Sequence, residues 1–208
     1  MKSRKVMIID YGMGNLHSIM NAFKYLNIET DITNNPKKIS NSNILILPGV
    51  GSFHQAMTQI KKKNIDQAIY ETIKKGNFLF GICLGMQLLG QSSTEDKYTV
   101  GLGVIRNKIK KFTNSETKNK KIPHVGFNSV QFDPQNKLFK GLKNKSDFYF
   151  VHSYRMLQEK LEKNISTTEY GINFLSSFNN ENIFATQFHP EKSQSNGLKV
   201  IENFIQLT

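Results

Sequence analysis

In the part of the chain up to Gly90, apolar residues form two kinds of run. Some are short and apolar throughout, which is typical of strands that are covered on both faces. In others, apolar residues recur every three or four positions, as on one face of a helix. The runs that predict strands are Lys5–Asp10, Asn43–Leu47 and Asn77–Phe80, together with the more polar stretch Ile28–Thr33. The runs that predict helices are Leu16–Leu26, with Asn15 placed to cap it, a helix or helix pair over Ser52–Lys75, and Leu84–Leu89.

After Gly90 the pattern changes. Turn signals separate short strand-like pieces, and this half is expected to be more antiparallel. The expected strands are Asn128–Phe132, Asp147–Val151, Ile165–Tyr170, Asn173–Phe178 and Ile183–Phe188, with a weaker one in Val104–Phe112. Ser92–Gly103 is expected as a loop, Asn114–Lys121 as a mobile polar tip, and Ser195–Leu207 as a closing helix. Together the two halves predict an α/β fold, with a mostly parallel central sheet and helices on both faces, formed by one domain over residues 1–208.

A candidate nucleophile lies where an expected strand meets an expected helix. Cys83, the only cysteine, stands in Gly81-Ile82-Cys83-Leu84-Gly85. This is the G-x-C-x-G form of a nucleophile elbow, in which glycines permit a sharp strand-to-helix turn. A helix N-terminus favours the thiolate form of a cysteine placed there. A buried structural cysteine is the alternative that this segment alone leaves open.

A nucleophilic cysteine needs a base and a group that orients the base. Of the five histidines, His189 stands out because Pro190 and Glu191 follow it directly at the end of an apolar run. Residues two apart in an extended segment point to the same side, so Glu191 is expected beside the His189 ring. His124 and His152, at the ends of expected strands, are also candidates. The sequence contains no arrangement typical of a metal site.

Charge and composition bear on the kind of partner and on the cellular compartment. The 208 residues carry a formal net charge of +12, but the only arginines are Arg4, Arg106 and Arg155, and the lysines are scattered. Nucleic-acid readers usually cluster arginine with aromatic residues, so a positive field that suits a phosphorylated substrate on a partner is the preferred interpretation. No run reaches the roughly 20 apolar residues of a membrane span, and Met1–Val6 lacks the apolar core of a signal peptide. A single cysteine cannot form an internal disulfide, which indicates the cytoplasm.

With these parts together, the sequence resembles the class I glutamine amidotransferases, and most closely the HisH family, the glutaminase subunits of imidazole glycerol phosphate synthase. The elbow and the His-Pro-Glu motif mark the superfamily. The segments that match in family order are 9–16, 47–51, 81–89, 123–126, 149–154 and 187–193. The resemblance implies a three-layer, flavodoxin-like fold and no cofactor or metal.

The resemblance also implies a mechanism. Cys83 attacks the side-chain amide of glutamine, His189 transfers protons, and Glu191 orients His189. Backbone N–H groups of Leu84, Val50 and Gly51 are expected to stabilise the oxyanion. We expect the Gly49-Val50-Gly51 peptide to reorient before that site is complete, since glycines ease such a change. The positions that match glutamine-binding residues are Gly49, Gly51, Gln87, Glu95, His152, Ser153 and Tyr154.

The resemblance also implies that the chain is one subunit of a heterodimer. The implied partner is a (β/α)₈-barrel cyclase, which receives the ammonia and adds it to a phosphorylated ribulosyl intermediate. The positions that match partner-facing residues are Asn15, Phe127, Tyr149 and Lys192.

Phe127 departs from the family, which typically has tryptophan at this position. Related subunits with phenylalanine supply ammonia for amidino or acetamidino sugars of surface polysaccharides, so that pathway is the first alternative. A non-catalytic basic binding or regulatory module is the second, and a cysteine hydrolase or protease that acts alone is the third.

Overall fold

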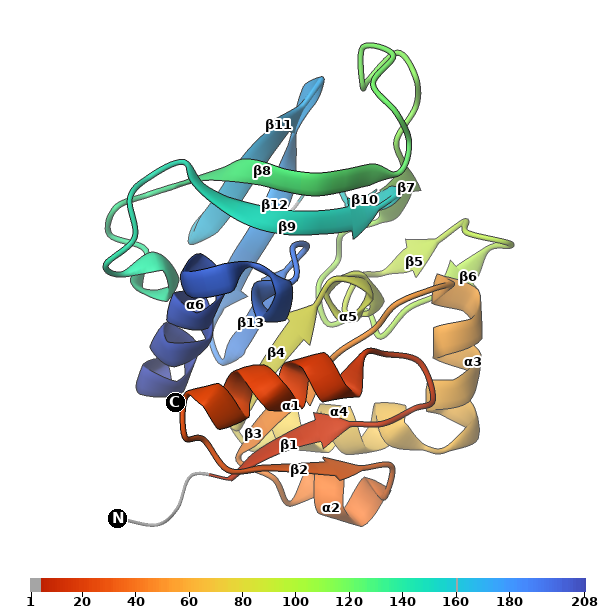
Figure 1. Cartoon of the computed structure of the whole chain (residues 1–208). Helices are drawn as coiled ribbons and strands as arrows, with labels where there is room; N and C mark the ends of the chain where they lie inside the picture. The colour runs from red at the N-terminus through yellow and green to blue at the C-terminus, as the bar shows by residue number, and fades with distance from the viewer. Residues whose placement is uncertain (1–4, 160) are drawn as a thin grey trace.

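The computed structural model describes residues 5–159 and 161–208. The predicted absence of a signal peptide concerns Met1–Val6, of which Met1–Arg4 lie outside the described residues. The chain is organised around a nine-stranded sheet with the order β2-β1-β3-β4-β13-β12-β11-β8-β9 (Figure 1). Its strands are β1 (Val6–Ile9), β2 (Thr30–Thr33), β3 (Ile44–Leu47), β4 (Phe78–Ile82), β8 (His124–Phe132), β9 (Ser146–His152), β11 (Ile165–Tyr170), β12 (Ile172–Asn180) and β13 (Ile183–Thr186).

The first five strands in this order are parallel to one another, whereas β12, β11, β8 and β9 pair antiparallel. The predicted contrast between the two halves is therefore confirmed. Strand β13 comes late in the chain but inserts beside β4, and its register matches Thr186 with Ile82. Because both strands run in the same direction, the residues that follow each of them meet at one edge of the sheet.

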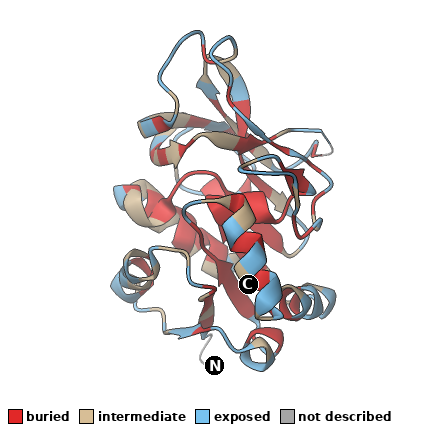
Figure 2. Cartoon of the chain, turned by 90° about the vertical axis from the view of Figure 1, so that its right-hand side faces the viewer, coloured by how far each residue is buried: buried red, intermediate tan, exposed pale blue. Residues whose placement is uncertain are grey.

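Helices cover both faces of the parallel part, as predicted (Figure 1). Alternate residues of one strand enter different cores: Ile8 packs with α1 (Leu16–Tyr25) and α6 (Gln194–Leu207), and Ile9 packs with α3 (Phe53–Lys62) and α4 (Ile65–Lys74). Figure 2 shows buried residues along the strands and on the inner sides of the helices. Burial on both faces explains why β1 and β3 are apolar throughout, whereas the edge strand β2 is mostly polar and largely exposed. In the described part of the chain, no helix is long and apolar enough to cross a membrane.

Several local predictions were wrong or incomplete. Asn35 and Pro36 begin an unpredicted helix, α2 (Pro36–Ser40), in which Asn35 caps the backbone N–H of Lys37 at 2.9 Å. The stretch predicted as a loop after Gly90 contains two very short strands, β5 (Ser92–Ser93) and β6 (Thr99–Val100). These join β7 (Ile109–Lys111) and β10 (Tyr154–Met156) in a second, four-stranded sheet.

The polar segment 114–121, predicted as a mobile tip, folds into hydrogen-bonded turns. Its Glu116 forms an ion pair with Arg155 of β10, with 2.6 Å between the carboxylate and guanidinium groups. Thr117, in the same segment, is fully buried. The turn is thus fastened to the second sheet by charge and by packing. Sequence polarity alone gave no sign of this anchor.

Candidate functional site

Cys83 stands at the sharp turn between β4 and α5 (Leu84–Leu88). Its backbone has φ 54° and ψ −107°, a combination that a residue with a side chain adopts only under strain. The backbone N–H of Cys83 donates a hydrogen bond to the carbonyl of Thr186 at 2.8 Å, which fixes the turn to the end of β13. This geometry is that of the predicted nucleophile elbow.

The two glycines of the motif are required by close packing. A β-carbon on Gly85 would overlap the backbone carbonyl of Leu47 in β3. A β-carbon on Gly81 would lie 3.0 Å from backbone atoms of Gly85. The elbow thus brings α5 directly against β3 and β4. A larger residue at position 85 would have to displace the backbone of β3, and one at position 81 would press against the backbone of α5.

His189 and Glu191 are in contact, as the sequence predicted. Nδ1 of His189 lies 2.8 Å from Oε1 of Glu191, and both side chains are almost completely shielded from solvent. The predicted reason was wrong, however. The strand ends at Thr186, and the two residues meet across a 3₁₀ turn, η2 (Pro190–Lys192), rather than by alternation along a strand.

The environment of His189 favours its charged form. Burial disfavours the imidazolium, but the neighbouring Cys83 and the Glu191 carboxylate outweigh burial and raise the pKa of His189 to about 10. Because Nδ1 donates to Glu191, the second ring nitrogen, Nε2, faces away from the carboxylate. Nε2 has no hydrogen-bond partner among the described residues. His189 is therefore placed to exchange a proton with Cys83 through Nε2.

The other candidate histidines form a neutral pair. Nδ1 of His124 lies 3.1 Å from Nε2 of His152, whose Nδ1 donates to the Tyr154 carbonyl at 2.9 Å. Burial lowers the pKa of His124 to about 4 and that of His152 to about 3, with nearby cationic groups adding to the effect. Neither ring is therefore suited to accept a proton at neutral pH. His189 is the base that the geometry favours.

A cavity of about 320 Å³ opens above Cys83. It is bounded by the elbow, the Gly-rich loop after β3, and the segment that joins β9 to β10. The lining residues are Val50, Gly51, Cys83, Leu84, Gln87, Glu95, Val151, His152, Ser153, Tyr154 and Lys192. All the predicted glutamine-binding positions except Gly49 are thus brought together.

Gly49 lies behind the cavity instead. A β-carbon there would overlap the hydroxyl of Tyr11 and would lie 2.9 Å from Cβ of Leu84. The Tyr11 hydroxyl donates a hydrogen bond to the carbonyl of Pro48 at 2.8 Å. The predicted oxyanion loop is therefore held between Tyr11 and the residue after the nucleophile. Sequence reasoning placed Tyr11 within a segment that matches the family but gave it no role at the site.

The three residues whose backbone N–H groups were predicted to stabilise an oxyanion, Leu84, Val50 and Gly51, all border the cavity. Leu84 is the first residue of α5, where the N–H group has no partner within its own helix. Val50 is exposed at the cavity wall, between Gly49 and Gly51. Gly51 has φ +99°, a conformation open to glycine but strained for other residues. The two segments could together supply donors to an oxygen bound near the Cys83 sulfur.

Glu95 provides an acidic group at the opposite wall. Its carboxylate accepts a hydrogen bond from the backbone N–H of Phe53 at 2.8 Å, which fixes it at the start of α3. Burial raises the pKa of Glu95, and the neighbouring Asp96 raises it further, although the hydrogen bond from Phe53 acts in the opposite direction. A carboxylate held in this way suits the ammonium group of an amino acid.

Three of the four predicted partner-facing positions lie together. The rings of Phe127 and Tyr149 meet edge to face on neighbouring strands, with centroids 5.6 Å apart. Nζ of Lys192 lies 5.8 Å from the Tyr149 ring and also borders the cavity. The fourth, Asn15, caps α1 by accepting a hydrogen bond from the N–H of Ser18, as predicted, and α1 packs against η2.

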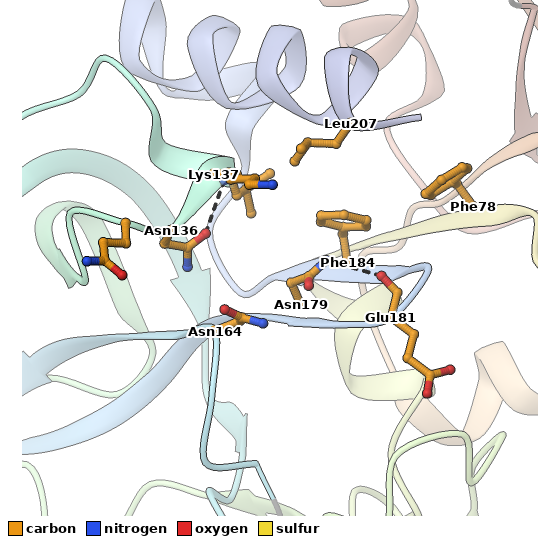
Figure 3. Close-up of a pocket in the computed structure, with 10 residues that line it drawn as sticks. Phe78, Asn136, Lys137, Asn164, Asn179, Glu181, Phe184 and Leu207 are labelled. Atoms are coloured by element: carbon orange, nitrogen blue, oxygen red, sulfur yellow. Dashed lines mark hydrogen bonds between the residues drawn. The ribbon is translucent and has the colours of Figure 1, made fainter.

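A second hollow lies at the other end of the parallel strands. It is flanked by Phe78, the first residue of β4, and by Asn136, Phe184 and Leu207 (Figure 3). Cys83 follows the opposite end of β4. This hollow therefore contains none of the candidate catalytic groups.

Comparisons with known proteins agree with this geometry. The family model described as "Glutamine amidotransferase class-I" matches residues 7–207. The chain is 44% identical to the imidazole glycerol phosphate synthase subunit HisH of Chlorobium chlorochromatii, over 97% of this chain and 100% of that protein. It is 47% identical to subunit HisH 2 of Methanococcus maripaludis, over 97% and 98% of the two chains.

Among solved structures, PurLQS from Thermotoga maritima matches with a TM-score of 0.78 at 16% identity, over 99% of both chains. A glutamine amidotransferase from Thermotoga maritima matches with a TM-score of 0.63 at 19% identity, over 100% of this chain and 84% of that one. These likenesses concern the fold. The family match and the relatives establish that the chain belongs to the class I glutamine amidotransferases and, within them, to the HisH family.

Proposed function

We propose that this chain is the glutaminase subunit of an imidazole glycerol phosphate synthase, which hydrolyses glutamine to glutamate and passes the ammonia to a cyclase subunit in histidine biosynthesis. The observation that carries the proposal is the buried His189–Glu191 pair, whose free Nε2 is available to the strained Cys83 at the base of the cavity. The names of the relatives supply the reaction and the pathway.

The first step transfers a proton and forms a carbon–sulfur bond. His189 takes the thiol proton of Cys83, and the thiolate attacks the side-chain carbonyl carbon of glutamine. The carbonyl π electrons move to oxygen, and the N–H groups of Leu84 and of the Val50–Gly51 segment stabilise the resulting oxyanion. Glu191 stabilises the imidazolium throughout.

The second step releases ammonia. His189 gives its proton to the amide nitrogen, the carbon–nitrogen bond breaks, and a γ-glutamyl thioester remains on Cys83. Water, deprotonated by His189, then attacks the thioester and releases glutamate, and the thiol is restored. The sequence of bonds formed and broken uses only groups of this chain, glutamine and water.

Glutamine is positioned by the cavity walls. Glu95 binds the α-ammonium group, and Gln87 contacts the bound amino acid from the first turn after the elbow. His152, Ser153 and Tyr154 close the opposite side, where the neutral His152 brings no second positive charge near the reaction. Gly49 acts indirectly, by letting the oxyanion loop approach Leu84.

The partner is a (β/α)₈-barrel cyclase that binds the face formed by Phe127, Tyr149 and Lys192. Lys192 lies beside the Tyr149 ring and also borders the cavity, so this face adjoins the cavity. Ammonia released above Cys83 therefore has a short path to it. Asn15, at the start of α1, extends the contact. Phe127 lies outside the cavity lining, so its difference from the family leaves the glutaminase chemistry unchanged.

The reaction fits a reducing compartment, because Cys83 acts only as a free thiol. We therefore place the enzyme in the cytoplasm, with residues 1–208 acting as one domain.

A basic binding module would not need a nucleophile, a base and an orienting carboxylate together. The surface-polysaccharide alternative would use the same steps with a different acceptor.

The test is the rate of glutamate formation from glutamine by the purified chain, measured alone and with the cyclase subunit bound to an acceptor analogue. We expect the complex to be much faster, because the Val50–Gly51 segment must be set by the partner before the oxyanion site is complete. Equal rates would contradict the dependence on a partner. No glutamate in either sample would contradict the proposed function itself.

A further inference from the structure

Gln187 contacts both the candidate nucleophile and Gln87 of the cavity wall, although it does not itself line the cavity. It directly follows β13, whose register with β4 places Gln187 beside Cys83. The Gln187 side chain is fully buried. Its Nε2 lies 3.7 Å from Sγ of Cys83, and its Oε1 lies 3.0 Å from Nε2 of Gln87. One amide thus bridges the sulfur and a cavity-lining residue.

The direction of this bridge is set by a backbone group. The carbonyl of Tyr154 can only accept a hydrogen bond, so the Gln87 atom 2.8 Å from it must be the amide nitrogen. The second hydrogen on that nitrogen points to Gln187, which must therefore present its oxygen. The Gln187 nitrogen is then the end that faces Sγ of Cys83. The arrangement makes Gln187 a donor to the sulfur rather than an acceptor.

A neutral N–H donor at this position favours the thiolate over the thiol. Hydrogen bonds to a charged partner are stronger than those to a neutral one, and burial strengthens the difference. An amide nitrogen has no lone pair available for the thiol proton, so Gln187 does not compete with His189 as the base. The donor and the base therefore have separate roles at the same sulfur.

We propose that Gln187 is a further catalytic residue, whose amide N–H stabilises the Cys83 thiolate and fixes the position of the sulfur. The proposal rests on the proposed function for the identity of the substrate, but the contact with the sulfur does not depend on it. Gln187 also links the sulfur to Gln87, so the group that contacts glutamine and the nucleophile are held by one continuous set of hydrogen bonds.

The test uses the fact that Cys83 is the only cysteine of the chain. The rate of alkylation by iodoacetamide is measured against pH, without glutamine or partner. Gln187→Met removes the donor while it keeps a side chain of similar length. We expect the midpoint of the alkylation profile to rise by about one pH unit or more, and the rate below the midpoint to fall about tenfold.

Two further variants keep the result interpretable. Gln187→Glu retains an acceptor for Gln87 but replaces the donor with an acidic group, so we expect an upward shift at least as large, even if Gln187→Met is poorly folded. Thr186→Val is the matched control. Thr186, the last residue of β13, is fully buried, and its hydroxyl donates to the Phe188 carbonyl at 3.0 Å rather than to the sulfur. We expect its profile to match that of the wild type.

Folded Gln187 variants with the wild-type midpoint would overturn the proposal, as would an equal shift in Thr186→Val. Because alkylation needs no turnover, the result is separate from the proposed function. If the chain has no glutaminase activity but the Gln187 variants still shift the alkylation midpoint, the role of Gln187 at the sulfur is supported. If the chain is an active glutaminase but the Gln187 variants show no shift of the alkylation midpoint, only the role of Gln187 is contradicted.

Discussion

Nδ1 of His189 donates a hydrogen bond to Oε1 of Glu191 across 2.8 Å, and solvent reaches almost none of either side chain. This contact fixes which ring nitrogen carries the first proton. It leaves Nε2 for the exchange of a proton with Cys83. Burial lowers the pKa of His189, but Cys83 and, after it, the Glu191 carboxylate raise it to about 10. Glu191 therefore sets the orientation of the base and, together with Cys83, its charge state.

Replacing Glu191 by glutamine should separate its role in orienting His189 from the effect of its negative charge. Glu191→Gln keeps an oxygen that can accept from Nδ1 but removes the negative charge that stabilises the imidazolium. We expect kcat for glutamine hydrolysis by the complex to fall about a hundredfold or more. The matched control is Glu202→Gln, since Glu202 pairs with Lys199 on the exposed side of α6. Equal activity in both variants would remove Glu191 from the mechanism.

Tyr11 provides a second test, of the oxyanion loop. Tyr11→Phe keeps the buried ring but removes the hydroxyl that donates to the Pro48 carbonyl. The loss of one neutral hydrogen bond should lower the free energy of unfolding by about 1 kcal/mol. Because the bond holds the loop next to Leu84, we also expect kcat to fall about fivefold with little change in KM. Tyr25→Phe, at an exposed tyrosine, is the control. A kcat equal to the wild type would show that the loop is held without Tyr11.

The buried pair of His124 and His152 should make stability depend on pH. Their pKa values in the folded chain, about 4 and about 3, lie below the unfolded value near 6.5. The unfolded chain therefore binds protons first as the pH falls. The stability that these residues contribute is complete above pH 6.5 and is lost toward pH 4 and below.

Urea unfolding between pH 7 and pH 5 measures this effect, since most carboxylates stay charged there. We expect the free energy of unfolding to fall by up to about 1.4 kcal/mol per pH unit for each histidine. His124→Gln should flatten the slope, and His17→Gln, at an exposed histidine, should leave it unchanged. His189 acts in the opposite sense, because its raised pKa gives stability below pH 6.5 that is lost as the pH rises through 10. A slope of zero between pH 7 and pH 5 would contradict the neutral pair.

The face that carries Phe127 should bind the cyclase. Phe127 is 51% exposed although its ring contacts Tyr149, so it is available to a partner. Phe127→Ala should weaken the complex about thirtyfold, the change that corresponds to the loss of about 2 kcal/mol from a central aromatic residue. Isothermal titration with the cyclase subunit measures the Kd. Tyr25→Ala, which removes an exposed ring elsewhere, should bind normally. Unchanged binding by Phe127→Ala would place the interface on another surface.

The sequence was sufficient to predict the parts of the site that lie within short motifs. Gly81 to Gly85 and His189 to Glu191 are each local, and their spacing reflects a required geometry. Even so, the reason for the His189–Glu191 contact was misjudged, because the strand ends at Thr186 and a 3₁₀ turn follows.

The contacts that depend on strand order could not be predicted in this way. Gln187 meets Cys83 only because β13 inserts beside β4, and Tyr11 meets the oxyanion loop only because β1 lies beside β3. Neither placement leaves a periodic signal in the sequence. The same holds for most of the second sheet. Only β7 lies within a stretch predicted as a strand, Val104–Phe112, and β5, β6 and β10 have two or three residues each, too few to show alternation.

The central claim is that Cys83 attacks glutamine and that its chemistry serves another chain. Its most direct test is the rate of glutamate formation by Cys83→Ala bound to the cyclase, compared with the wild-type complex at equal occupancy. We expect no glutamate above the uncatalysed background from the variant, while the complex itself still forms. Glutamate formation by Cys83→Ala at the wild-type rate would contradict the account.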